Sequence, residues 1–243
     1  MRDPLRSLTL DALHVWSILL SQSDDVVHVL EEHLSTDEIR RADRYRRERD
    51  RSRYVVAHGA LRELLADYMA QTPREISFGH TATGKPFLIN KRGSAPIRFN
   101  LSHSGEWALV GLALSTEVGI DIEQIDSDVS VEAIAERFFS RSEFEALQRV
   151  PLEQRQAAFF SAWTRKEAYV KARGDGIADR LRSFSVSVDP EQSAILLTDS
   201  IDASAMLHWR IYDLHIIPNY AAAVAAEGTT HQIHMMRWTH TLF

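Results

Sequence analysis

The order of the predicted elements constrains the fold most strongly, because a strand, a long helical stretch and several strands follow one another twice. In the first half, residues 8–20 predict a strand and residues 35–68 predict a helical stretch with a break near Arg49 and Asp50. The apolar residues between 54 and 68 recur at the spacing of a helix face that packs on a core. Short strands follow, which favours an α+β fold.

The second half repeats this order. The halves join near residues 112–117, where residues 107–114 and 118–122 predict a pair of strands with a short turn between them, and residues 130–173 predict three helices. Strands are expected between residues 183 and 226, and no element is predicted in the histidine-containing tail after Gly228. The pattern predicts two α+β halves of similar size.

Composition restricts the class of protein. The 243 residues are 44% hydrophobic, which suffices for a core in one large domain or two small ones. The absence of cysteine excludes disulfides, a thiolate nucleophile and a zinc–thiolate site, and fits a reducing compartment. Neither a signal-peptide pattern nor an apolar run long enough for a membrane helix occurs, so we expect a soluble cytoplasmic protein with no membrane partner.

The net charge of −6 is distributed unevenly. Residues 40–53 contain eight arginines against three acids, a local charge of +5 that leaves −11 for the rest of the chain. A basic patch on an acidic protein favours one discrete anionic partner over nucleic acid. The alternative is a solvated helix face with ion pairs at i,i+4 spacing.

Two acidic clusters stand beside groups suited to a phosphate. Asp121 and Glu123 point to one face of the predicted strand, because side chains alternate along a strand. Glu167 and Lys171 lie four residues apart and share one face of the third helix. Three carboxylates can hold one hard divalent cation while lysines hold the phosphates that it bridges, which indicates metal-assisted phosphoryl chemistry. The alternatives are a wet strand face and an ordinary exposed ion pair.

A run of small polar residues at 99–105 ends in Gly105, which permits close approach of a ligand to the backbone. Ser102 and His103 in this run are suited to donate hydrogen bonds to a phosphate, and Lys85 in a predicted turn could supply a point charge. The run lacks the Gly-x-Ser-x-Gly elbow of a hydrolase. A structural histidine and an ordinary loop lysine are the alternatives.

Taken together, these motifs resemble the Sfp-type 4′-phosphopantetheinyl transferases in order and spacing. The matching motifs are GKP at 84–86, FNLSHSG at 99–105, GIDIE at 119–123, FF at 138–139 and WTRKEAYVK at 163–171, followed by Gly174 and Gly176. Upstream, the arginine-rich residues 49–53 and ALR at 60–62 resemble the basic helix of this family. The resemblance covers about 100 residues closely, and the two ends of the chain match only in outline.

The resemblance implies a monomer with two similar α+β lobes related by pseudo-twofold symmetry and an active site between them. Residues 1–114 would contact the 3′-phosphate and adenine of coenzyme A, and residues 115–243 would hold the metal and the pyrophosphate. Such enzymes transfer the 4′-phosphopantetheine arm of coenzyme A to a serine of an apo acyl or peptidyl carrier protein. They release adenosine 3′,5′-bisphosphate and depend on Mg²⁺, with Mn²⁺ as a possible substitute.

The resemblance also assigns the reacting groups. Asp121, Glu123 and Glu167 would hold Mg²⁺, and Lys171 would contact the pyrophosphate. Lys166 belongs to the same coenzyme A-binding set. Glu167 would serve as the general base, with Asp121 or solvent as the alternative acceptor of the proton.

A second group would hold the 3′-phosphate end of coenzyme A. The matching residues are Ser102, His103 and Lys85, together with an arginine such as Arg49 or Arg53. The 3′-phosphate would then be the anion that the arginine-rich residues 40–53 bind. Which of the eight arginines makes the contact stays open.

Two other functions fit some of these residues. A Mg²⁺-dependent nucleotide pyrophosphatase or phosphodiesterase would use the same carboxylates and lysines. A nucleic-acid-binding module would use the arginine-rich helix, but the acidic remainder of the chain argues against it. The sequence leaves open whether a fatty-acid, polyketide or nonribosomal-peptide carrier is the partner.

Overall fold

A computed structural model describes residues 8–89, 95–174, 180–189, 192–229 and 231–240. The predicted Gly176 lies outside these residues. The first half contains β1 (Ala12–Leu19), α1 (Asp24–His33), α2 (Thr36–Ala42), α3 (Glu48–Met69), the 3₁₀ turn η2 (Pro73–Glu75), β2 (Phe78–His80), β3 (Pro86–Leu88), β4 (Ile97–Ser104) and β5 (Trp107–Leu114).

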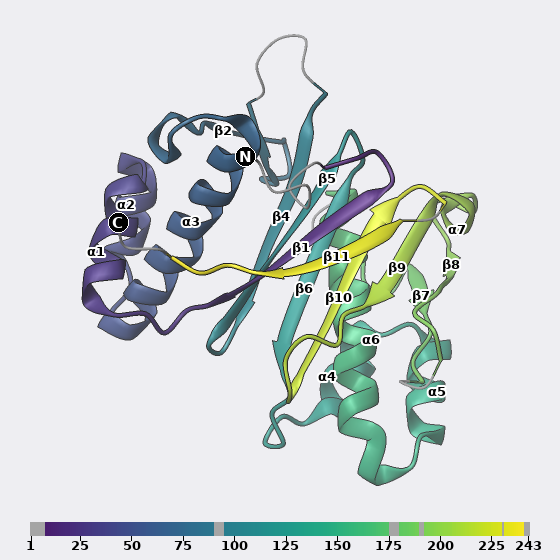
Figure 1. Ribbon diagram of the computed structural model, residues 1–243. Coiled ribbons are helices and arrows are strands. Elements are labelled where there is room, and N and C mark those ends of the chain that lie inside the picture. Colours follow the sequence, from purple (N-terminus) through teal and green to yellow (C-terminus); the bar gives the residue numbers. More distant parts are fainter. Residues whose placement is uncertain (1–7, 90–94, 175–179, 190–191, 230, 241–243) are drawn as a thin grey trace.

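The second half contains the remaining elements. They are β6 (Val118–Gln124), α4 (Val131–Phe138), α5 (Arg141–Arg149), α6 (Leu152–Arg173), β7 (Phe184–Val186), β8 (Leu196–Asp199), α7 (Ala205–His208), β9 (Trp209–Asp213), β10 (Tyr220–Glu227) and β11 (Gln232–Arg237). The mixture of helices and mainly antiparallel sheets confirms the predicted α+β class (Figure 1).

Two sheets organise the molecule. The first has the order β11-β1-β5-β4 and the second has the order β6-β10-β9, while β2-β3 and β7-β8 form small separate hairpins. All neighbouring strands are antiparallel except β1 and β11, which run parallel. The orders β1-β5-β4 and β6-β10-β9 match, and α3 and α6 each have 22 residues. The pseudo-twofold axis itself stays a prediction.

Alternation along the strands sends side chains into three cores. Residues 16 and 18 of β1 pack against α1 and α3, whereas residues 13 and 15 face the second sheet. In the same way, β10 turns residues 221, 223 and 225 toward α6 and residues 222, 224 and 226 toward the first sheet. The two sheets therefore pack face to face, with α1–α3 and α4–α6 on their outer sides (Figure 1).

The helix signals in the sequence are confirmed in detail. Ser35 with Glu38 and Ser140 with Glu143 form capping boxes at the starts of α2 and α5. Gly174 ends α6 in the left-handed conformation, with φ of 70°. The first helical stretch does break, but between Ala42 and Glu48, so the predicted position near Arg49 and Asp50 lies inside α3.

The elements differ from the sequence-based expectation in the following ways. The strands β5 and β6 do not pair, because β1 and β4 already occupy both edges of β5, and β6 pairs with β10. Helix α1 was not predicted. Strand β11 lies in the tail that showed no strand signal, and its hydrogen-bonding partner β1 stands at the other end of the chain.

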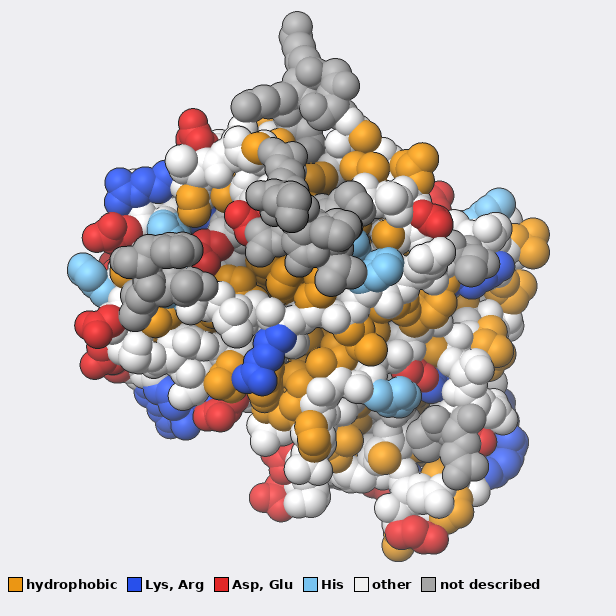
Figure 2. Space-filling model, viewed as in Figure 1, with side chains coloured by type: hydrophobic (Ala, Val, Ile, Leu, Met, Phe, Trp, Pro, Cys, Tyr) orange, Lys and Arg blue, Asp and Glu red, His pale blue; other side chains and the backbone are white. Residues whose placement is uncertain are grey.

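On the face shown in Figure 2, hydrophobic side chains gather across the middle.

Candidate active site

The edge strands of the two sheets meet through side chains. Strand β4 turns Asn100, Ser102 and Ser104 toward β6, because these residues share one parity along the strand. The contacts are Asn100 Oδ1 accepting from the Ile120 amide at 2.8 Å, Ser102 Oγ donating to Asp121 Oδ1 at 2.9 Å, and Ser104 Oγ donating to Glu123 Oε2 at 2.8 Å. The FNLSHSG and GIDIE motifs thus form one polar seam between the halves.

Helix α6 completes this seam with Lys171. Its Nζ atom lies 2.5 Å from Asp121 Oδ1 and donates to Ser102 Oγ at 3.1 Å. Gly119 on β6 allows the helix to come this close, because a Cβ atom there would lie 2.2 Å from the carbonyl oxygen of Ala168 and the amide of Ala172. The predicted partner of Lys171 on its own helix, Glu167, is replaced by a carboxylate of the neighbouring strand.

Burial changes the acidity of the three carboxyls. Asp121 is 2% exposed, and burial raises its pKa against the opposing effects of Lys171 and Ser102. The pKa of Glu123 is raised by burial and by the charge of Asp121. Burial raises the pKa of Glu167 to about 7, with further upward contributions from Asp121 and Glu123. The three side chains therefore interact electrostatically, and each ionises less readily than in water.

The donor set fits a hard divalent cation in its chemistry. Asp121 Oδ2 is buried and has no hydrogen-bond partner among the described residues, and three mutually repelling carboxyls gain from a shared positive ion. Among the residues that the structure describes, no three acidic or histidine side chains are already gathered closely enough to hold one metal ion. The carboxyls lie near one another without forming a closed coordination sphere.

His103 lies between Ser102 and Ser104 on β4 with the opposite parity, and it interacts electrostatically with several cations. Burial lowers its pKa, and Lys171, Arg41 and Arg53 lower it further. The Arg53 guanidinium also pairs with Glu106 at 3.2 Å, in the turn that follows β4. By contrast, the Arg49 side chain is 65% exposed and forms a long ion pair with Asp50, at 3.7 Å. The structure therefore brings Arg53 to the site, and it adds Arg41, which sequence reasoning did not single out.

Two lysines that the resemblance assigned to coenzyme A already have protein partners in the structure. Lys166 is fully buried, and its ammonium group donates to both oxygens of Glu143 and to the Phe184 carbonyl at 2.7–2.9 Å. Consecutive helical residues point about 100° apart, so Lys166 faces the core while Glu167 faces β6. Lys85 Nζ donates to Glu117 and to two backbone carbonyls, which engages all three of its hydrogens.

Asn100 and Ser104 were also missed as site residues. Both lie in the quoted FNLSHSG motif, two residues on either side of Ser102. The acidic pair in β6 has the same spacing of two, so alternation along two facing strands is the signal that could have found them.

Comparison with known proteins identifies the same family as the sequence motifs. A model of the N-terminal part of 4′-phosphopantetheinyl transferases matches residues 20–115, and a model of the 4′-phosphopantetheinyl transferase superfamily matches residues 117–225. The 4′-phosphopantetheinyl transferase HetI of Nostoc sp. is 37% identical over 227 residues, which cover 93% of this chain and 92% of that protein. The chain belongs to the 4′-phosphopantetheinyl transferase superfamily.

Other members of the superfamily are more distant. The 4′-phosphopantetheinyl transferase Sfp of Bacillus subtilis is 29% identical, over 79% of this chain and 82% of that protein. A solved holo-(acyl-carrier-protein) synthase of Bacillus anthracis, in complex with coenzyme A (3′,5′-ADP), is 21% identical with a TM-score of 0.38 and covers 47% of this chain and 96% of its own. Among these relatives, HetI matches this chain over almost its whole length.

Proposed function

We propose that this chain transfers the 4′-phosphopantetheine arm of coenzyme A to a serine of an apo acyl or peptidyl carrier protein. The observation that carries the proposal is the meeting of Asp121, Glu123, Glu167 and Lys171 at the junction of β4, β6 and α6, in a chain of this superfamily. Acids with raised pKa values beside a lysine suit the transfer of a charged phosphoryl group.

The transfer moves one proton and exchanges one bond. The serine oxygen of the carrier forms a bond to the phosphorus that bears the pantetheine arm, and the bond from that phosphorus to the nucleotide phosphate breaks. Glu167 would accept the serine proton, with Asp121 or solvent as the alternative acceptor. Lys171 opposes the charge that develops on the departing adenosine 3′,5′-bisphosphate.

Asp121, Glu123 and Glu167 would hold the divalent cation, Mg²⁺ or Mn²⁺, with Asp121 offering its unpartnered Oδ2. Such an ion neutralises charge on the pyrophosphate when it is bound. Lys171 and Ser102 keep Asp121 oriented through its other oxygen, Oδ1.

The 3′-phosphate would be held by His103 with Arg53 and Arg41. These three groups interact electrostatically in the structure, and Arg53 lies partly covered beside the turn after β4. The lowered pKa of His103 favours the neutral ring in the free protein, so it would donate one hydrogen bond and the arginines would supply the charge. Arg49 stays a weaker prediction for this role.

The division into lobes at residues 114 and 115 is part of the proposal. Its support is that the two family models meet between residues 115 and 117. No helix in the described part of the chain has the length and apolar character needed to span a bilayer. A monomeric state, a cytoplasmic location and the lack of a nucleic-acid partner stay predictions.

Intact mass spectrometry of apo carrier proteins tests the proposal. A panel of fatty-acid, polyketide and nonribosomal-peptide carriers is incubated with the chain, coenzyme A and Mg²⁺. We expect one carrier class to gain the mass of one phosphopantetheine arm, and to gain nothing when its serine is replaced by alanine. Hydrolysis of coenzyme A in the absence of any carrier, without mass gain in its presence, would instead identify a pyrophosphatase.

A further inference from the structure

The turn of residues 81–85, between β2 and β3, contacts the C-terminal end of α6. Lys85 Nζ donates to the Ala172 carbonyl at 2.7 Å, and Thr83 Oγ1 donates to the Gly174 carbonyl at 2.5 Å. The last carbonyls of a helix have no partner within the helix. Groups from the first half of the chain thus satisfy the end of a helix in the second half.

The turn is held in shape by its own hydrogen bonds. The Gly84 amide donates to the Thr81 carbonyl at 2.9 Å, and the Thr81 amide donates to the Lys85 carbonyl at 3.0 Å. The Lys85 amide donates to Thr81 Oγ1 at 3.1 Å, and the two threonine hydroxyls lie 2.8 Å apart. Since the hydroxyl hydrogen of Thr83 is used on Gly174, Thr81 must donate to Thr83. The chain of bonds runs from the turn backbone to the helix end.

Lys85 adds a positive charge to this contact. Its ammonium lies against the carbonyl end of α6, which carries the negative pole of the helix dipole. Its other hydrogens go to Glu117 at 2.8 Å and the Val118 carbonyl at 3.4 Å, both at the start of β6. One side chain therefore joins the turn, strand β6 and helix α6, and retains no hydrogen for a phosphate.

The fixed end of α6 is the part that carries Lys171. Ala172, whose carbonyl Lys85 holds, is the next residue, and Glu167 lies one turn earlier. Lys171 must reach across to Asp121, and displacements of about 1 Å in a catalytic group can reduce rates up to 100-fold. We propose that the 81–85 turn is a cap that fixes the last turn of α6, and that Lys85 is a positioning residue acting through Lys171. This inference rests on the proposed transferase function.

Lys85→Met tests the inference because it keeps the aliphatic stem and removes the ammonium. Arg98→Met is the matched control, since Arg98 pairs with the same carboxylate, Glu117, at 3.0 Å. Transfer rates are measured with coenzyme A and with dephospho-coenzyme A. For Lys85→Met we expect kcat to fall about tenfold with both substrates while KM for coenzyme A changes by less than about threefold. Arg98→Met should match the wild type.

Hydrogen exchange of the amides at 171–174, without substrate, gives a second measurement. Lys85→Met and Thr83→Val should both speed this exchange, and Arg98→Met should not. This measurement does not depend on enzymatic activity. It can therefore contradict the proposed role of the 81–85 turn even if the proposed transferase reaction is correct, and the reverse. If Lys85→Met fails to fold, Thr83→Val decides through the same two measurements. Unchanged exchange, or a rise in KM for coenzyme A alone with kcat retained, would overturn the positioning role.

Discussion

At the scale of single residues, the carboxyls of the site differ from surface acids because protein surrounds them. Asp121 is almost wholly buried with one oxygen engaged by Ser102 and Lys171, and its other oxygen has no hydrogen-bond partner in the part of the chain that the structure describes. Such an arrangement stabilises the fold little and favours a positive ligand.

Asp121→Asn should therefore reduce transfer on the order of 100-fold or more and leave the folded state at least as stable. The amide still accepts from Ser102 and Lys171, and one of three repelling acids is gone. Rates and thermal melting are measured together. Glu132→Gln on α4 is the control, because this carboxylate is half exposed and pairs with Arg155 away from the seam. Equal turnover in the Asp121 variant and the wild type would refute the metal-site assignment.

Glu167 should make the stability of the metal-free protein depend on pH. Its pKa rises from 4.5 to about 7 on folding, so the native state binds more protons than the unfolded chain between these values. The free energy of unfolding contributed by Glu167 therefore falls as pH rises through this window and levels off above it.

Urea unfolding of the wild type and Glu167→Gln from pH 4.5 to 8 checks this sign. The variant should gain on the wild type as pH rises to 7, because glutamine does not titrate. Added Mg²⁺ should stabilise the wild type most above pH 7, where the carboxylate is charged. A stability difference that is constant with pH would contradict the raised pKa.

His103→Ala and Arg53→Ala should raise KM for coenzyme A more than they lower kcat, since the 3′-phosphate is remote from the reacting bond. We expect about tenfold for Arg53, the scale of a hydrogen bond between charged groups, and less for the neutral His103. Both variants should use dephospho-coenzyme A like the wild type. Arg40→Ala, which removes an exposed partner of Asp37, is the control. An equal loss on dephospho-coenzyme A would rule out contact with the 3′-phosphate.

At the scale of elements, the approach of α6 to β6 sets the geometry of the site. The two elements are in contact at Gly119, where the helix backbone occupies the space of a side chain. Any residue with a Cβ atom at this position would push apart Asp121 and Lys171. Glycine is needed here because the helix backbone leaves no room for a side chain, and not because the backbone angle is unusual.

Gly119→Ala should lower the free energy of unfolding by about 1–3 kcal/mol or more, since the added carbon meets helix backbone that cannot rotate away. Gly111→Ala is the matched control, because its nearest neighbour, a methyl group of Val118, would lie 3.4 Å from the new carbon. Urea denaturation of both variants measures the difference. Equal stability of the two would show that α6 lies farther from β6 than the structure indicates.

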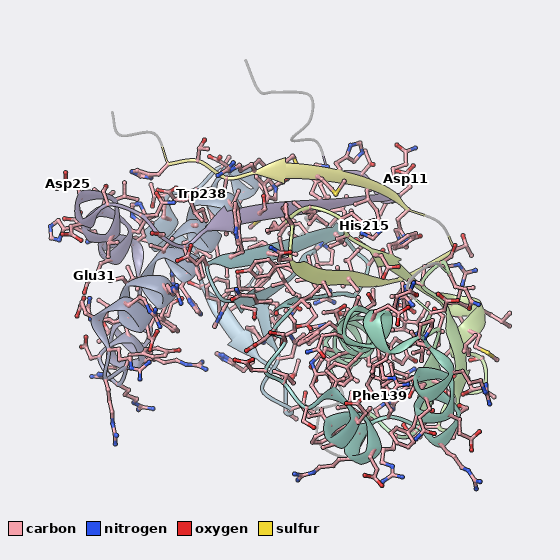
Figure 3. All side chains as sticks on the ribbon, turned by 90° about the horizontal axis from the view of Figure 1, so that it is seen from below. Asp11, Asp25, Glu31, Phe139, His215 and Trp238 are labelled. Carbon is pink, nitrogen blue, oxygen red and sulfur yellow. The ribbon has the colours of Figure 1, made fainter. Side chains whose placement is uncertain are left out.

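At the scale of the whole molecule, a strand from the C-terminal part of the chain pairs with the first strand. Strand β11 pairs with β1 from Ala12 opposite Gln232 to Ser17 opposite Arg237, so the last described residues complete the first sheet. Figure 3 shows Trp238, just after this strand, beside the helices of the first half. Its indole donates to Glu63 of α3 at 3.1 Å. The C-terminal segment is thus part of the N-terminal core.

Trp238→Ala should destabilise the protein by about 3–5 kcal/mol, the cost of deleting a large buried aromatic side chain. Met235→Ala, on β11 three residues before Trp238 and 56% exposed, should change stability by less than about 0.5 kcal/mol. Denaturant unfolding followed by tryptophan fluorescence or circular dichroism measures both. A Trp238 variant as stable as the Met235 variant would mean that β11 is not a structural part of the first sheet.

The sequence by itself determined the features that depend on near neighbours along the chain. The capping boxes at Ser35 and Ser140, the glycine end of α6 and the strand character of β4 and β6 follow from spacing of a few residues. The same locality placed Asp121 with Glu123 on one strand and Glu167 with Lys171 on one helix. The family resemblance then supplied their chemistry, because its motifs are also local.

Only the tertiary structure decided which distant groups these residues meet. Sequence spacing could not show that Lys171 pairs with Asp121, that Lys166 is buried against Glu143, or that Lys85 caps α6. It also could not show β11 beside β1, since a weakly alternating segment becomes a strand only when a partner edge is present. The physical reason is the same in each case: the free energy of these contacts comes from burial and pairing across the fold, which no short stretch of sequence contains.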